Sequence, residues 1–583
     1  MRIATVTPAV LALALAGGAA RAGEAEIDML WGVNVPLRDG VRLNATVFKP
    51  KPQAAPLPVV FTLTPYNSDS YYPRARYFAQ NGYVFALVDV RGRGNSEGAF
   101  LPFENEGRDG HDVVEWLARQ PWCDGKVAMW GGSYAGFDQW ATLQHFPPHL
   151  VTIVPAAAAA GVDFPAQNNV HFPYEMQWTT LTGGVTPQPN LFGDSAFWIS
   201  KFRDLYLSHR PFRDLDRIVG NPSPWFQRVL DHPRVDEFWK ALRPSPSDYA
   251  RMALPILTIT GHYDDDQYGA MHYYRAHLAH GTPEGKERHY LIVGPWDHAG
   301  TRTPSREVGG LSFGPASLLD LNALHKAWYD WTMKGGPKPE FLKGRVAWYV
   351  VPADQWRYTD RLEAIAAETR TLYLESDGSA NDAFRSGSLS PRKPGASEPD
   401  RYVYDPLDVR PAALETDEVK GYLTDQRYVL STFGNGVLYT SEAFAEEVEI
   451  TGYVRLEAWI ALDVPDTDFL VSLYEVLADG TSVRLAEDVR RARYRESLER
   501  EVLVPPGQAL RYTFDSFPFF SRRVAKGSRL RLFLRCPNSI HIEKNYNGGG
   551  VVAEETASDA RTAHVTVYHD ADHPSALTLP VAR

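Results

Sequence analysis

Short apolar runs alternate with amphipathic segments through the first half of the chain. The runs have the length and the flanking turn residues of buried strands. The segments between them repeat apolar positions with the helical period, as in residues 109–118 and 134–143. This alternation indicates a parallel sheet with helices on both sides. The predicted strands are residues 43–48, 59–64, 83–89, 127–130, 150–154, 255–260 and 290–293.

The alternation stops in two regions. Residues 155–251 are dense in aromatic side chains and lack strand signals, which predicts an inserted, mostly helical cap. A helical subdomain whose aromatic residues fill only its own core is the alternative. Beyond about residue 337 a period of two returns, for example at Leu530, Leu532 and Leu534. It predicts an antiparallel β-sandwich of the jelly-roll kind, with residues 376–400 as a long surface loop.

Composition narrows the class of protein. A chain of 583 residues with 44% hydrophobic and 22% charged residues is an ordinary globular protein of several domains. The formal charge of −11, with no long basic run, argues against nucleic acid as a partner. The two cysteines, Cys123 and Cys536, have no metal-ligand spacing, and two separate buried thiols are the favoured interpretation.

The N-terminus has the three parts of a secretory signal. Arg2 precedes an apolar stretch over residues 6–16, and Ala20-Arg21-Ala22 forms an A-x-A cleavage site. No other apolar run is long enough to cross a bilayer. We expect residues 1–22 to be removed and the mature protein to be secreted or periplasmic; a frayed apolar terminus is the alternative.

One stretch combines a strand, a sharp turn and a helix around a serine. The apolar run over residues 127–130 ends at Gly131-Gly132-Ser133, and a helical pattern follows directly. A serine at such a turn is held on a strained bend, with a helix N-terminus aimed at it. The stretch predicts the nucleophile elbow of an α/β-hydrolase, in the form G-x-S-x-x-G. A glycine-rich turn that merely contains a serine is the alternative.

The remainder of a catalytic triad follows in the order that this fold uses: serine, acid, histidine. Asp264 comes after the strand over residues 255–260, and His298 comes after the strand over residues 290–293. Ser133, Asp264 and His298 are therefore the predicted nucleophile, orienting acid and base. The nearest alternatives are His262, His289 and Asp297.

Three consecutive carboxylates, Asp264 to Asp266, need a separate explanation. Their spacing matches the start of a calcium loop, but Arg275 stands where a bidentate glutamate is required, so we reject a calcium site. One carboxylate would orient the histidine, and another would give the pocket negative charge for a cationic group of the substrate. A merely solvated acidic face is the alternative.

Two further loops follow strands of the sheet. Tyr66 lies just after the strand over residues 59–64, at the position that supplies part of the oxyanion hole in this fold. Residues 89–98 partly match a dinucleotide-binding loop, but Glu97 breaks G-x-G-x-x-G, so a structural turn is favoured.

These motifs together resemble the cocaine esterase / X-prolyl dipeptidyl peptidase family, which includes α-amino acid ester hydrolases and glutaryl acylases. The resemblance covers essentially the whole mature chain. It is carried by Thr-Pro-Tyr66, by Asp-Val-Arg-Gly-Arg-Gly-Asn-Ser-Glu-Gly over residues 89–98, by Gly-Gly-Ser-Tyr-Ala-Gly over residues 131–136, by Gly-His-Tyr-Asp over residues 261–264 and by Gly-Pro-Trp-Asp-His over residues 294–298.

The resemblance implies a role for each matching residue. Ser133 would attack the acyl carbon, His298 would take its proton and Asp264 would hold the imidazole. The Tyr66 hydroxyl and the Tyr134 backbone N–H would bind the oxyanion, and water would then release the acyl group. No metal or organic cofactor is implied.

An acidic cluster distinguishes the α-amino acid ester hydrolases from the other branches of the family. The α-amino acid ester hydrolases hold the substrate ammonium with carboxylates, two of which lie just after the catalytic aspartate. The matching positions here are Asp266 and Gln267, and Asp163 is the match for a third acid from the start of the cap. The cluster would be weaker by one charge. Pairing of Asp163 and Asp266 with cap arginines is the alternative.

The sequence thus predicts a signal peptide (1–22), an α/β-hydrolase domain (23–154 and 252–336), a helical cap (155–251) and a jelly-roll β-sandwich (337–583). We expect a secreted serine hydrolase of small esters, amides or short peptides, including α-amino acyl substrates. An X-Pro dipeptidyl peptidase, a glutaryl-type acylase and a non-catalytic carbohydrate-binding protein are the competing readings. We expect no nucleic-acid or membrane partner; a homo-oligomer is compatible with the sequence.

Overall fold

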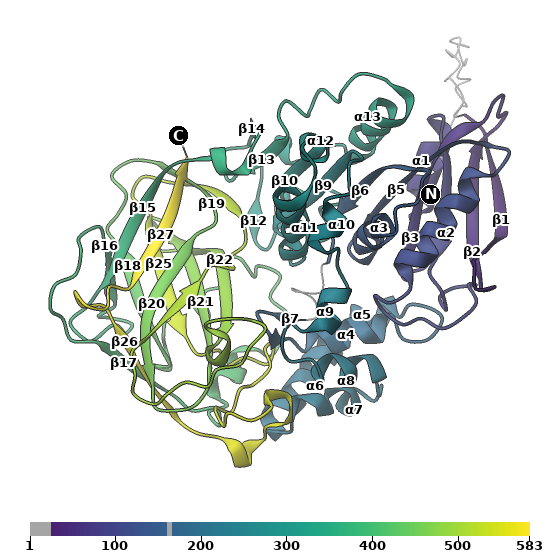
Figure 1. Ribbon diagram of the computed structural model, residues 1–583. Helices are drawn as coiled ribbons and strands as arrows, with labels where there is room; N and C mark the ends of the chain where they lie inside the picture. The colour runs from purple at the N-terminus through teal and green to yellow at the C-terminus, as the bar shows by residue number, and fades with distance from the viewer. Residues whose placement is uncertain (1–24, 160–165, 583) are drawn as a thin grey trace, which may run out of the picture.

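The computed structural model describes residues 25–159 and 166–582, so the expected signal peptide lies outside the described residues. The molecule has an α/β part, a helical part below it in the view of Figure 1, and a C-terminal β-rich part at the left of that view. No helix in residues 25–159 and 166–582 has both the length and the apolar character of a membrane span.

The α/β part is built on a ten-stranded sheet in the order β1-β2-β4-β3-β5-β6-β9-β10-β13-β14. Neighbouring strands from β4 through β13 are parallel, whereas β1, β2 and β14 pair antiparallel at the two edges. All seven strands predicted in this part are present. The strands are β1 (Ile27–Pro36), β2 (Arg42–Pro50), β3 (Leu57–Thr64), β4 (Val84–Asp89), β5 (Cys123–Gly132), β6 (Leu150–Ala156), β9 (Ile256–Tyr263), β10 (His289–Asp297), β13 (Val346–Val350) and β14 (Gln355–Thr359).

Helices cover both faces of this sheet. Side chains of α2, α3 and α11 enter one apolar core, and side chains of α1 and α13 enter the core on the opposite face. This arrangement is the doubly covered α/β fold that the sequence predicts, and it leaves the carboxyl ends of the strands free to carry loops. The helices are α1 (Tyr72–Gln80), α2 (Glu106–Ala118), α3 (Tyr134–Gln144), α11 (Gln267–His280), α12 (Pro283–Glu287) and α13 (Leu321–Lys334).

The sheet extends further along the chain than the division at residues 336 and 337 anticipates. β13 is buried throughout and pairs parallel with β10, Val346 lying opposite Leu291. β14 then returns antiparallel along β13. The period-two pattern of the C-terminal region does not reveal which sheet a strand joins, because strand pairing is decided by distant segments.

The cap consists of short helices beneath the sheet in Figure 1. One of its apolar clusters joins Trp178 and Trp239 of the cap to Phe103, Tyr134 and Phe137 of the α/β part. The cap aromatics therefore do more than fill their own core, against the alternative considered above. The elements are β7 (Ala166–Gln167), β8 (Val170–His171), α4 (Tyr174–Leu181), α5 (Pro189–Phe192), α6 (Ser195–Ser208), α7 (Leu215–Val219), α8 (Pro224–Leu230), α9 (Glu237–Ala241) and α10 (Pro246–Tyr249).

The C-terminal part holds thirteen strands around one large apolar core. Its strands pair antiparallel, except that β16 pairs parallel with β18. The jelly-roll connectivity stays a prediction, and β16 lies inside residues 376–400, so that stretch is not wholly a loop. The strands are β15 (Ala366–Glu375), β16 (Gly387–Ser390), β17 (Asp400–Tyr404), β18 (Gly436–Ser441), β19 (Val448–Gly452), β20 (Arg455–Leu462), β21 (Asp468–Val476), β22 (Ser482–Arg491), β23 (Leu510–Phe514), β24 (Phe520–Val524), β25 (Arg529–Arg535), β26 (Ala563–Tyr568) and β27 (Ala576–Ala582).

The two cysteines do not pair. Cys123 and Cys536 are both free and buried, as the sequence favoured.

Candidate active site

Ser133 occupies a sharp bend between β5 and α3. Its backbone has φ 62° and ψ −128°, a combination that costs a non-glycine residue energy and persists only where the surroundings impose it. The Ser133 N–H donates to the Ala156 carbonyl at 2.9 Å, which holds the bend against β6. A Cβ on Gly136 would lie 2.8 Å from the same carbonyl, so the glycine is needed for this close approach. The turn has the geometry of a nucleophile elbow.

His298 and Asp264 meet across the ends of β10 and β9. The His298 Nδ1 lies 2.9 Å from Asp264 Oδ1, and the Asp264 side chain is fully buried. The Thr260 hydroxyl donates to Asp264 Oδ2 at 2.8 Å, and the Asp266 N–H donates to Oδ1 at 3.1 Å. The carboxylate fixed by these bonds accepts a hydrogen bond from the His298 Nδ1–H. This bond keeps the imidazole proton on Nδ1 and leaves Nε2 unprotonated and available as a base.

The charges around His298 act on its pKa in opposite directions. Burial and the nearby Arg302 lower the pKa, whereas Asp266 and Asp264 raise it, and the net effect is a pKa above the usual value. The imidazolium form is therefore stabilised, as a general base requires after it accepts a proton.

Tyr66 and Tyr134 flank the serine. The Tyr66 hydroxyl lies 3.4 Å from Ser133 Oγ and accepts a hydrogen bond from the Trp178 indole N–H at 2.9 Å. Burial raises the pKa of Tyr66 to about 12, so the hydroxyl keeps its proton at neutral pH. Tyr134 is the first residue of α3, where backbone N–H groups lack helical partners. Its hydroxyl donates to Glu106 at 2.8 Å, which anchors the residue.

Among the described residues, the Ser133 hydroxyl is hydrogen-bonded to Tyr66 and not to His298. Both side chains nevertheless line the same cavity. Catalytic hydrogen bonds are often long in a ligand-free site and shorten when substrate binds.

The acidic cluster is only partly assembled as expected. Asp266 Oδ2 lies 3.7 Å from His298 Nδ1, and burial raises the Asp266 pKa to about 7. Asp265 is an exposed residue that lines the cavity, and desolvation there raises its pKa too. Gln267 points elsewhere: its amide donates to the carbonyls of Gly261 and Phe519, at 2.8 Å each. Asp163 lies outside the described residues.

The nearest alternatives to the triad have other partners. His262 Nε2 lies 2.6 Å from the Tyr349 carbonyl, and burial lowers the His262 pKa to about 4. His289 lies 2.8 Å from the Thr258 hydroxyl inside the sheet. Asp297 accepts a hydrogen bond from the Gly300 N–H at 2.8 Å. These contacts leave His298 and Asp264 as the candidate base and orienting acid in the cavity that Ser133 also lines.

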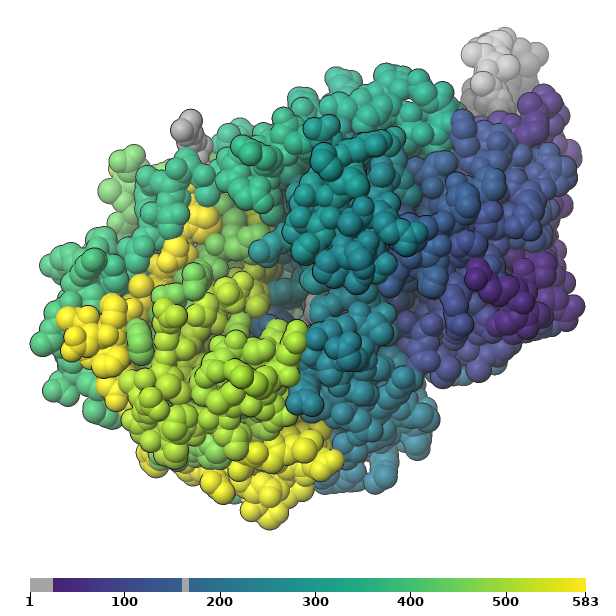
Figure 2. Space-filling view, viewed as in Figure 1, coloured from purple at the N-terminus to yellow at the C-terminus, as the bar shows by residue number. Residues whose placement is uncertain are grey.

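A cavity of about 820 Å³ joins these groups to residues from all three parts of the molecule. In the space-filling view the parts meet around a hollow at the centre of the face shown (Figure 2). Sequence reasoning missed much of its wall, because no local motif marks residues that become neighbours only on folding. The missed residues include Tyr174 and Trp178 from the cap and Tyr422, Arg484, Glu487 and Arg535 from the C-terminal part.

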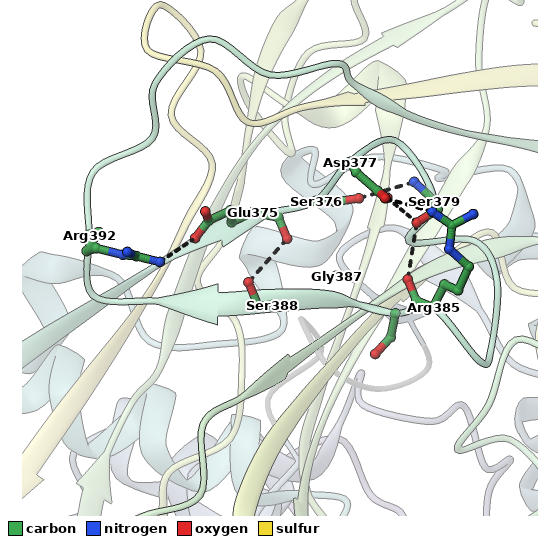
Figure 3. Close-up of a pocket in the computed structure, with 9 residues that line it drawn as sticks. Glu375, Ser376, Asp377, Ser379, Arg385, Gly387, Ser388 and Arg392 are labelled. Carbon is green, nitrogen blue, oxygen red and sulfur yellow. Dashed lines mark hydrogen bonds and ion pairs between the residues drawn. The ribbon is translucent and has the colours of Figure 1, made fainter.

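A second hollow, of about 460 Å³, lies on the C-terminal part beside β15 and β16 (Figure 3). Its charged side chains pair with one another: Asp377 with Arg385 at 2.7 Å and Glu375 with Arg392 at 3.8 Å. Serine side chains line the rest of the hollow, and no histidine does. It therefore lacks the combination of serine and histidine side chains that lines the larger cavity.

Two family models match this chain. Residues 39–300 match the X-Pro dipeptidyl-peptidase (S15 family) model, and residues 339–578 match the X-Pro dipeptidyl-peptidase C-terminal non-catalytic domain. The chain belongs to the S15 family. The resemblance noted from the sequence motifs is thereby confirmed.

Several hydrolases are similar to this S15 member in sequence or in fold. It is 28% identical to the cocaine esterase of Rhodococcus sp. (strain MB1 Bresler), over 94% of this chain and 98% of the relative. Its fold matches an α-amino acid ester hydrolase with a TM-score of 0.82 at 21% identity, covering 99% and 98% of the two chains. It also matches an aminopeptidase from a marine sediment archaeon, Thaumarchaeota archaeon, with a TM-score of 0.80 at 21% identity, covering 96% and 97%. The α/β-hydrolase fold with a β-rich C-terminal domain follows from these matches.

Proposed function

We propose that this chain hydrolyses ester or amide bonds with Ser133 as nucleophile, His298 as general base and Asp264 as the acid that orients the histidine. The observation that carries the proposal is the 2.9 Å contact between His298 Nδ1 and the buried Asp264, in the cavity that also holds the strained Ser133. Ser133, Asp264 and His298 lie at the ends of three different strands and line one cavity, which supports the proposal.

In the first step, Ser133 Oγ forms a bond to the acyl carbon while its proton passes to His298 Nε2. The carbonyl electron pair moves to oxygen, where the Tyr66 hydroxyl and the Tyr134 backbone N–H stabilise the negative charge. When the carbonyl re-forms, the bond to the leaving group breaks, and His298 returns the proton to the leaving alcohol or amine.

In the second step, water replaces the leaving group. His298 Nε2 takes a proton from the water as its oxygen bonds to the acyl carbon, and the bond to Ser133 Oγ breaks. The serine regains a proton from the histidine, and the acid product leaves. Asp264 stays ionised throughout and stabilises the imidazolium.

Replacing the nucleophile tests this assignment. Ser133→Ala is expected to lower kcat for p-nitrophenyl acetate by roughly 10⁴-fold or more, because the covalent path is lost. Ser195→Ala is the matched control, since Ser195 lines the same cavity but bonds to Glu418 at 2.6 Å. Unchanged hydrolysis by Ser133→Ala would refute the triad.

We propose further that the acyl part of a good substrate carries an α-amino group. Asp265 and Asp266 place carboxylates in the cavity, and Asp266 lies next to the catalytic histidine. Attraction between unit charges near a protein surface is about 4 kcal/mol at contact before desolvation, enough to select an ammonium. A glutaryl group, which is anionic, would be repelled by the same carboxylates, so the acylase alternative is less favoured.

The comparison of phenylglycine methyl ester with its N-acetylated form tests this specificity. We expect the free amine to be preferred by at least tenfold in kcat/KM and the preference to fall in Asp266→Asn. Equal rates for the two esters would contradict the ammonium site. Release of p-nitroaniline from Gly-Pro-p-nitroanilide would favour the X-Pro dipeptidyl-peptidase alternative instead.

We also propose that the protein is exported after removal of residues 1–22. The charged start, the apolar run and Ala20-Arg21-Ala22 support this proposal. N-terminal sequencing of the protein recovered outside the cytoplasm should begin at Gly23. A retained Met1 would contradict it.

A further inference from the structure

Trp178 of the cap lies against both predicted oxyanion donors. Its indole Nε1 is 2.9 Å from the Tyr66 hydroxyl oxygen. Its ring stacks on the Tyr134 ring, with centroids 5.7 Å apart and planes 16° apart. Tyr134 is in turn anchored through its hydroxyl to Glu106 at 2.8 Å. One cap residue therefore touches the side chains of both residues that are expected to stabilise the oxyanion.

The chemistry of the indole determines where the Tyr66 proton points. An indole N–H is a donor only, so the Tyr66 oxygen must accept that hydrogen bond. The tyrosine O–H must then donate in another direction. Among the described residues, the other hydrogen-bond neighbour of this hydroxyl is Ser133 Oγ at 3.4 Å. Ser133 Oγ is thus the acceptor within reach of the Tyr66 proton, and the oxyanion forms beside it.

The buried setting reinforces this orientation. Tyr66 is partly buried and packs edge-on against Tyr134, with ring centroids 6.5 Å apart, at the border of the aromatic cluster of Phe103, Tyr134 and Trp178. Burial raises the pKa of Tyr66 to about 12, so the hydroxyl remains a neutral donor at neutral pH. The hydroxyl is held by contacts to Trp178 and Ser133, and a donor held in place before the reaction is the condition for a preorganised oxyanion site.

We propose that Trp178 is a positioning residue of this hydrolase: its indole N–H orients the Tyr66 hydroxyl toward the oxyanion, and the cap thereby takes part in transition-state stabilisation. The inference rests on the proposed function, in which Tyr66 is an oxyanion donor. Helix α4, which carries Trp178, would then position an oxyanion donor in addition to shaping the substrate pocket.

Trp178→Phe removes the N–H and retains an aromatic ring for stacking on Tyr134. The oxyanion is present only in the transition state, so the loss should appear in kcat and leave KM nearly unchanged. One hydrogen bond of ordinary strength corresponds to a decrease in kcat of about 5- to 10-fold. We expect this decrease for p-nitrophenyl acetate.

A double-mutant cycle separates positioning from general structural damage. Tyr66→Phe alone should lower kcat by about 100-fold or more, as the loss of an oxyanion donor does. If Trp178 acts through the Tyr66 hydroxyl, adding Trp178→Phe to Tyr66→Phe should cause less than a twofold further change. Trp198→Phe is the matched control: Trp198 lines the same cavity, but its Nε1 donates to the Leu191 carbonyl at 2.7 Å.

Two results would overturn the inference. One is an equal loss from Trp178→Phe with and without the Tyr66 hydroxyl, which would indicate a packing or folding effect. The other is a change confined to KM, which would indicate a role in substrate binding only. Failure of the proposed function is distinguishable, because Ser133→Ala would then retain hydrolysis regardless of the outcome of the cycle.

Discussion

At the scale of single residues, the environment of His298 determines how activity depends on pH. The groups that act on it are Asp264 and Asp266, which raise its pKa, and Arg302, which lowers it together with burial. The histidine must be neutral to act as a base, so kcat/KM should fall as pH decreases through this raised pKa. The acid limb of the pH profile therefore reports the charges around the imidazole.

We expect Asp266→Asn to move that acid limb to lower pH. The substitution removes one of the two carboxylates that stabilise the imidazolium, so the histidine stays neutral at more acidic pH. The measurement is the pH dependence of kcat/KM for p-nitrophenyl acetate, an uncharged ester. Asp417→Asn, at a cavity carboxylate of the C-terminal part, is the control and should leave the limb in place. A shift to higher pH in Asp266→Asn would contradict the assignment.

Asp264 and Gln267 show how far the roles of single residues could be assigned from the sequence. Asp264 could be predicted as the partner of His298, because its place after a strand and the chain order of the triad are local features. The direction of Gln267 could not be predicted, because its amide is bound by the carbonyl of Phe519, more than two hundred residues along the chain.

At the scale of elements, the elbow depends on how closely α3 approaches β6. A Cβ on Gly136 would lie 2.8 Å from the Ala156 carbonyl oxygen and 3.0 Å from two carbon atoms of Ala158. These contacts are shorter than packed atoms allow, and the obstacle is largely backbone, which cannot rotate away. The glycine therefore sets the distance between the helix and the sheet, and with it the position of Ser133.

Gly136→Ala should destabilise the protein although alanine favours helices. The helical preference is worth about 1 kcal/mol, whereas overpacking at a rigid contact costs about 1–3 kcal/mol and shifts the helix. We expect a lower midpoint of thermal unfolding and a fall in kcat for p-nitrophenyl acetate. Gly395→Ala, where a Cβ would meet nothing within 4 Å, should change neither. A fully active and equally stable Gly136→Ala would show that α3 can move without cost.

At the scale of the whole molecule, buried polar contacts connect the C-terminal part to the other two. Arg491 pairs with Asp468 at 2.8 Å and with Glu543 at 2.7 Å, and all three side chains are buried. The Glu543 N–H donates to the His171 carbonyl of the cap at 2.9 Å. Gln267 likewise bonds to the backbone of Phe519, which connects the loop of Asp264 to the C-terminal part. These contacts fix the positions of the cavity walls relative to one another.

Breaking the buried ion network should lower the stability of the folded chain. Arg491→Met leaves two carboxylates buried without their cation, which typically costs about 3–5 kcal/mol. We expect a clearly lower unfolding temperature and a parallel loss of activity on heating, because the network borders the cap as well. Arg500→Met removes a surface pair in which the arginine side chain is 70% exposed, and it should have almost no effect. Equal stabilities of the two variants would contradict a role for the network.

The sequence by itself determined the features that depend on residues close to one another along the chain. The seven strands, the glycine-flanked Ser133 and the order of serine, acid and histidine are visible because periodicity and turn chemistry are local. Its family motifs were sufficient to place the chain among S15 hydrolases.

The tertiary structure alone decided which distant segments meet. It placed β13 and β14 in the first sheet, turned Gln267 away from the cavity and set Trp178 against Tyr66. It also brought the C-terminal part to the cavity wall beside Asp265. Each of these contacts joins residues separated by long stretches of chain, and the free energy that selects them comes from packing and hydrogen bonds that no local pattern encodes.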